Sequence, residues 1–134
     1  MSGPDAVRAF VDAFNAEDLD ALVAVCDPEV EIQTSRGIVI GHEEARTWAT
    51  RNPHGDLHQR LVLEELRQDD HRAHVVATAR RQWYWRAHPD EIADEKELAL
   101  VVTIRDGLIA RWQPFEDPDE ALRAAGGMGR ESGE

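Results

Sequence analysis

The chain has 134 residues, of which 42% are hydrophobic and 31% charged, a composition typical of one globular domain with a single core. Its 27 acidic and 15 basic residues give a formal net charge of −12, which argues against nucleic-acid and membrane-surface binding. Apolar runs such as residues 98–102 are far shorter than the ~20 residues of a membrane-spanning helix. Because Asp5 and Asp12 interrupt any signal-peptide pattern, we expect a cytoplasmic protein.

Two amphipathic helices are predicted at the start of the chain. The first follows a Ser2 N-cap, and its apolar positions recur at the three- and four-residue spacing of one helix face: Val7, Phe10, Val11 and Phe14. The second follows an Asp18 N-cap and stops before Pro28. Its expected buried stripe consists of Leu19, Leu22, Val23 and Cys26.

A short β segment and a third helix are predicted next. Val30 and Ile32 alternate with polar residues, which is typical of a strand with one buried face, and a second short strand is expected over 38–40. The third helix is predicted over 42–51, with acidic residues near its positive end. We expect Ala45, Trp48 and Ala49 on its inner side.

The remainder of the chain is predicted to be mainly β. Four long strands are expected over 57–66, 73–85, 96–105 and 108–115. Asp106-Gly107 is a strong hairpin signal, whereas residues 87–94, interrupted by Pro89, are expected to form a longer acidic loop. A last short helix begins at Asp117. Residues 1–125 are expected to form one domain, followed by a disordered tail over 126–134.

The cysteine and histidine content predicts no metal site. Cys26 is the single cysteine, which excludes an internal disulfide and any multi-cysteine zinc or iron–sulfur site, and we expect it to pack in the core. The pairs His54/His58 and His71/His74 lie in or beside turns, so solvated histidine is favoured over metal ligation. We therefore expect neither a metal nor a cofactor.

Several local sequences, in this order, resemble one superfamily. They are FVDAFNAEDLDAL (10–22), DPEVEI (27–32), GHEEARTW (41–48), DGLIARW (106–112) and FEDPDEAL (115–122). The ordered set resembles the nuclear transport factor 2-like superfamily, in particular its SnoaL-like branch of small polyketide cyclases. The resemblance implies an α+β fold in which three N-terminal helices pack in the concave face of a strongly curved, mainly antiparallel sheet, a cone-shaped, cystatin-like roll with a short C-terminal helix. It also implies a ligand pocket and a homodimer.

The resemblance does not supply a known reaction. Steroid isomerases of this superfamily use a carboxylate base with a tyrosine and a protonated aspartic acid as oxyanion donors. Alignment of the motifs places Phe10, Thr34 and Leu100 at those positions. Phenylalanine and leucine cannot donate a hydrogen bond, and threonine cannot abstract a proton near neutral pH, so this mechanism is not expected here.

The family register, read with strand alternation, predicts the residues that face the cavity. The candidates are Phe14, Gln33 or its neighbour Thr34, Trp48, Ala79, Trp83, Leu100 and Trp112. Small residues followed by an arginine and two indoles predict a roomy cavity with a polar, aromatic mouth. Such a cavity suits a small hydrophobic or amphipathic ligand.

Three side chains are candidates for acid–base chemistry. If Arg81 and Glu116 both point inward, they should pair with each other or contact ligand, with Glu116 as general base or acid and Arg81 orienting an oxygen. His58 is a candidate for proton transfer. Alternatively, Glu116 lies in water at the strand end and Arg81 belongs to a surface ladder. The sequence thus leaves three functions open. The first is a cofactor-free acid–base enzyme of the isomerase, cyclase, dehydratase or hydrolase type. The others are a non-catalytic dimeric binding module with a vestigial pocket and a purely structural dimer.

Overall fold

A computed structural model describes residues 2–34, 36–50, 57–69, 74–117, 119–121 and 123. The elements, in chain order, are α1 (Gly3–Ala16), α2 (Leu19–Ala24), β1 (Cys26–Thr34), β2 (Gly37–Ile40), α3 (His42–Thr50), β3 (Leu57–Asp69), β4 (His74–Trp85), β5 (His88–Arg105) and β6 (Leu108–Phe115). Helical residues follow at 119–121 and at 123. The predicted tail lies outside the described residues.

The helices begin where the capping residues predict. The Ser2 hydroxyl accepts a hydrogen bond from the Asp5 N–H at 3.2 Å, and the Asp18 carboxylate accepts one from the Ala21 N–H at 3.1 Å. None of the described helices is long and apolar enough to span a bilayer.

Cys26 is buried as expected, but its predicted place on the second helix is wrong. The helix ends at Ala24, and Cys26 opens β1 with 2% of its surface exposed. Its thiol donates to the Leu22 carbonyl at 3.3 Å. Burial, with a smaller contribution from the negative charge of Asp27, raises the pKa of the thiol to about 12, so it stays protonated at neutral pH.

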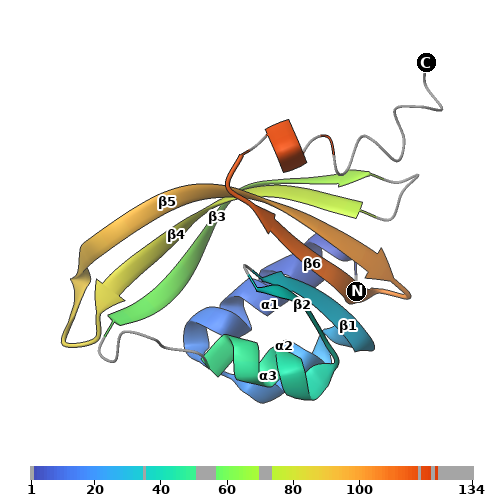
Figure 1. The fold of residues 1–134 in the computed structure, drawn as a ribbon, viewed down its shortest axis with the longest axis horizontal. Helices are drawn as coiled ribbons and strands as arrows, with labels where there is room; N and C mark the ends of the chain where they lie inside the picture. The colour runs from blue at the N-terminus through green and yellow to red at the C-terminus, as the bar shows by residue number, and fades with distance from the viewer. Residues whose placement is uncertain are drawn as a thin grey trace.

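The six strands form one sheet that bends over the helices. The strand order is β2-β1-β6-β5-β4-β3; β1 and β6 are parallel, and the other neighbours are antiparallel. Figure 1 shows the three helices on one side of the curved sheet and the short C-terminal helix on the other. This is the α+β roll that the sequence predicts, and we call the helix-bearing side the concave face and the other side the convex face.

The acidic loop expected over 87–94 is instead part of a long β-hairpin. β4 ends at Trp85, and β5 begins at His88 after a two-residue turn. Pro89 is tolerated because the described pairing of β5 with β6 reaches only Ala99, so the outer half of β5 has a strand neighbour on one side only. The hairpin in Figure 1 extends past the helices.

Strand alternation divides the sheet residues between the two faces. The buried concave set on β4, β5 and β6 comprises Val75, Ala77, Ala79, Leu98, Leu100, Val102, Ile104 and Trp112, as the sequence predicts. On the convex face, Ala99 and Val101 pack with Ala121 of the C-terminal segment. The helices therefore cover the main core, and the C-terminal segment covers a smaller second cluster.

Asn15 protects the exposed edge of the sheet. β3 is an edge strand, and the Asn15 side chain both donates to the Leu61 carbonyl and accepts from the Leu61 N–H, each at 2.8 Å. The amide thus occupies two backbone groups that would otherwise be open to pairing with another chain. This contact also joins the end of α1 to the strand.

Candidate ligand site on the concave face

The part of the concave face around Trp112 and Phe10 is filled by packed side chains. Trp112 is 1% exposed, and its ring stacks on Phe10 with centroids 4.2 Å apart. Ala79 and Leu100 are fully buried beside them. These predicted pocket residues therefore belong to the core.

Farther from this packed region, the concave side carries aromatic side chains that remain partly accessible. Phe14 of α1 and Trp48 of α3 lie with ring centroids 5.6 Å apart, and both are half-buried. Trp83, on the concave side of β4, is also half-buried. These three half-buried aromatic side chains come from two helices and a strand, whereas the sequence predicts a mouth formed by β4 alone.

Arg81 lies between Ala79 and Trp83 on the concave side of β4 and is directly opposite Lys96 in the ladder with β5. Its guanidinium carbon is 5.8 Å from the centroid of the Trp83 ring. Its Nε atom is buried and hydrogen-bonds to none of the residues that the structure describes. Burial lowers the pKa of Arg81, and the attraction of Glu116 partly opposes this effect.

Glu116 follows β6 and lies at the edge of the same face. Its side chain is 83% exposed, and its carboxylate is 3.5 Å from the ammonium group of Lys96. Within the described part of the chain, Arg81 and Glu116 attract each other but form no ion pair. The structure therefore places Glu116 in water at the strand end, the second of the two alternatives, whereas Arg81 does not belong to an exposed ladder.

His58 lies apart from Arg81 and Glu116. It is opposite Tyr84 in the β3–β4 ladder. Tyr84 follows Trp83 directly, so strand alternation places His58 and Tyr84 on the other side of the sheet from Arg81 and Trp83. Arg86 donates to its Nε2 atom at 2.6 Å, and the Glu17 carboxylate lies 3.7 Å from its Nδ1 atom. The ring thus joins the end of α1 to the tip of the β4–β5 hairpin.

The two polar candidates on β1 lie on different faces. Ile32 is fully buried opposite Trp112, so Gln33 points to the other side, where its carbonyl accepts from the Gln113 amide at 3.2 Å. The expectation that Gln33 lines the concave pocket is therefore wrong. The Thr34 hydroxyl is used in the turn to β2, where it donates to the Gly37 carbonyl at 2.7 Å.

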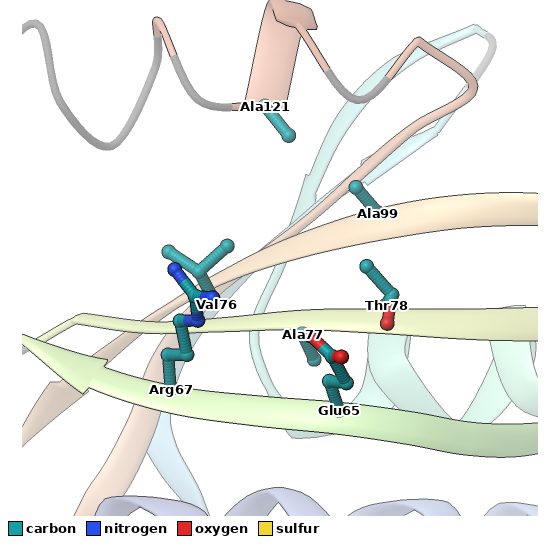
Figure 2. A pocket seen from close by; sticks show the side chains of 7 residues that line it. All are labelled: Glu65, Arg67, Val76, Ala77, Thr78, Ala99 and Ala121. Carbon is teal, nitrogen blue, oxygen red and sulfur yellow. The ribbon is translucent and has the colours of Figure 1, made fainter.

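A groove of about 120 Å³ lies on the convex face, under the C-terminal segment. Figure 2 shows side chains from the sheet projecting toward Ala121. Its lining consists of Glu65, Arg67, Val76, Ala77, Thr78, Ala99 and Ala121. The sequence reading did not find this groove, because it depends on where the C-terminal segment crosses the sheet.

Lys96 is not among the site residues predicted from the sequence, although strand alternation places it on the concave face. It lies two residues before Leu98, so alternation places it on the concave face with Leu98 and Leu100. It is the only lysine of the sequence. Within the described residues, no group of three or more His, Cys, Asp or Glu side chains is arranged to hold a metal ion.

Comparison with known proteins identifies the family. A model of the SnoaL-like domain matches residues 7–112. No curated protein matches the chain.

Solved structures share the fold at low sequence identity. A candidate polyketide cyclase from Pseudomonas putida is 18% identical, with a TM-score of 0.70 over 93% of this chain and 98% of that one. A Mycobacterium tuberculosis epoxide hydrolase is 18% identical, with a TM-score of 0.68 over 92% and 88% of the two chains. The protein TerC, crystallised with polyporic acid, is 18% identical, with a TM-score of 0.67 over 92% and 96%.

Proposed function

Because the chain belongs to the SnoaL-like domain family, we propose that its concave face binds a small amphipathic molecule. The observation that carries the proposal is the Nε atom of Arg81, buried beside Trp83 without a hydrogen-bond partner among the described residues. A buried guanidinium N–H that finds no acceptor is costly, and a ligand oxygen would satisfy it. Structures of the same fold include an epoxide hydrolase and a protein crystallised with an organic acid, which supports small-molecule binding.

The ligand's apolar part would lie among the aromatic side chains of the outer concave face. Phe14, Trp48 and Trp83 come from three different elements and are only half-buried, so each retains surface that a ligand can cover. The fully buried Trp112 and Leu100 would form the floor beneath it. This arrangement suits a flat or partly apolar molecule with one polar end directed at Arg81.

The chemistry that fits this site is cofactor-free proton transfer. Glu116 at the edge would accept a proton from the ligand, and Arg81 would stabilise the negative oxygen that develops. The steroid-isomerase donors are absent from their expected positions: Phe10 and Leu100 are fully buried, and neither can donate a hydrogen bond. His58 contacts Arg86 away from Arg81, so the proposal gives it no step.

Titration with 2-naphthol, followed by nuclear magnetic resonance, tests the binding site. The indole N–H signals of Trp48 and Trp83 should shift in proportion to occupancy, because both rings border the proposed site. The backbone amides of Val76 and Thr78, which border the convex groove, serve as the control and should stay in place. Shifts confined to Val76 and Thr78 would assign binding to the groove and contradict the proposal.

The second candidate is a non-catalytic dimeric module, which the convex face favours. Val62 and Ile92 are 38% and 47% exposed, and their ladder partners Arg80 and Tyr84 lie on the convex side of β4. Exposed apolar side chains on a sheet face are a feature of interfaces between copies.

An Ile92→Asp variant tests this dimer. Burying an unpaired carboxylate in an apolar interface is unfavourable, so we expect the dimer dissociation constant to rise at least about tenfold, measured by sedimentation equilibrium. Ile38→Asp is the matched control, since Ile38 is 54% exposed on β2, far along the strand order from β4. Equal behaviour of the two variants would rule out the convex interface.

A further inference from the structure

We propose that the ligand of the concave face is an aromatic carboxylate whose negative group is held jointly by Arg81 and Lys96. This inference rests on the proposed ligand-binding function and adds the charge and shape of the ligand. Three features carry it: the buried Nε atom of Arg81, the second cation opposite it, and the indole of Trp83 beside it.

The guanidinium of Arg81 is suited to a carboxylate. Its Nε atom is buried and finds no acceptor in the described part of the chain, and Arg81 forms no ion pair there. A guanidinium presents its N–H groups as a planar fork that matches the two oxygens of a carboxylate. Because the group is partly removed from water, its attraction for an anion is weakened less by solvent than that of a surface arginine.

Lys96 adds a second positive charge at the same place. It is the direct ladder partner of Arg81, and like charges directly opposite each other on one sheet face repel unless an anion lies between them. Glu116 approaches Lys96 at 3.5 Å, but its side chain is 83% exposed and it does not pair with Arg81. Asp94, opposite Trp83, accepts the Glu95 N–H at 2.9 Å. Glu116 therefore attracts Arg81 from a distance, and no carboxylate of the described residues contacts its guanidinium.

The neighbours of Arg81 indicate a planar ligand. Trp83, two residues later on the same face, places a half-buried indole ring 5.8 Å from the guanidinium carbon of Arg81. A ring stacked on Trp83 places an attached carboxylate at the level of the guanidinium. The formal net charge of −12 repels anions in general. Affinity for an aromatic carboxylate must therefore come from the local positive charges of Arg81 and Lys96.

The test compares 2-naphthoate with the neutral 2-naphthamide by isothermal titration calorimetry. The wild-type chain should bind 2-naphthoate at least about tenfold more tightly, since charge-assisted hydrogen bonds are stronger than neutral ones. Arg81→Gln should abolish this preference. Arg80→Gln, at the adjacent position on the opposite face where it pairs with Glu64 at 3.0 Å, should retain it.

Two further variants keep the outcome decisive if Arg81→Gln does not fold. Lys96→Gln changes a side chain that is 57% exposed and should reduce 2-naphthoate affinity several-fold without affecting 2-naphthamide. Glu116→Gln removes a neighbouring negative charge and should tighten 2-naphthoate binding about two- to fivefold. If both probes bind equally well to the wild-type chain and to Lys96→Gln, the carboxylate inference fails and the ligand site stands. If neither probe binds, the proposed function fails as well.

Discussion

Replacing Trp112 with alanine should destabilise the protein by about 3–5 kcal/mol, the usual cost of removing a large aromatic side chain from a packed core. Trp112 is 1% exposed, stacks on Phe10 at 4.2 Å and faces Ile32 across the parallel β1–β6 pair. The substitution would therefore leave a cavity where the helix layer meets the centre of the sheet. Because domains of this size are stabilised by about 5–15 kcal/mol, a large part of the total would be lost.

Urea unfolding monitored by circular dichroism measures this effect, with Trp85→Ala as the matched control. Trp85 is 45% exposed at the end of β4, so its removal should cost no more than about 1 kcal/mol. Similar losses for the two variants would mean that Trp112 does not anchor the core, and the floor of the proposed ligand site would then need a different description.

Replacing Asn15 with alanine should lower the free energy of unfolding by about 1–3 kcal/mol, because two hydrogen bonds to the Leu61 backbone are lost together. The loss should be concentrated at the edge of the sheet. Hydrogen exchange at the Leu61 amide should accelerate, since its N–H is the group that Asn15 covers. Unchanged exchange at Leu61, with a global loss of stability, would show that the side chain stabilises α1 rather than the edge.

Asn15→Asp separates the two hydrogen bonds. A carboxylate can accept from the Leu61 N–H but repels the Leu61 carbonyl, whereas a protonated carboxyl can satisfy both groups. Folding should therefore raise the pKa of this new carboxyl. The variant should be most stable below its unfolded pKa of about 3.9 and lose stability, relative to wild type, as the pH rises through the folded value. A pH-independent difference from wild type would contradict this account.

The sequence predicts the elements that have one buried face. The spacing of Val7 and Phe10 and the alternation of Leu98 and Leu100 follow from burial against a core, and the structure confirms these elements. The part of β5 before the predicted strand was missed because residues 88–95 are exposed, so hydrophobic and polar side chains do not alternate there. A strand held only by its neighbour's backbone carries little signal in its own sequence.

For the candidate site, the sequence predicts which face of the sheet a residue lies on, but not which residues it contacts. Alternation is sufficient to place Arg81 with Ala79 and Trp83, because all three share one face of a regular strand. It cannot place both Gln33 and Thr34 on one face, and only the burial of Ile32 opposite Trp112 decides between them. The exposure of Glu116 depends on how far the sheet extends beyond the helices, which no local pattern records.

The buried thiol of Cys26 can serve as a natural probe for transient opening of the hydrophobic core. A protonated sulfur at 2% exposure is shielded from alkylating and disulfide-exchange reagents while the core is intact. Since the chain has no other cysteine, any labelling by such a reagent reports exposure at this one position, where β1 meets α2 and β6. The rate of thiol modification under native conditions would thus measure how often the core around Cys26 opens, without an engineered probe.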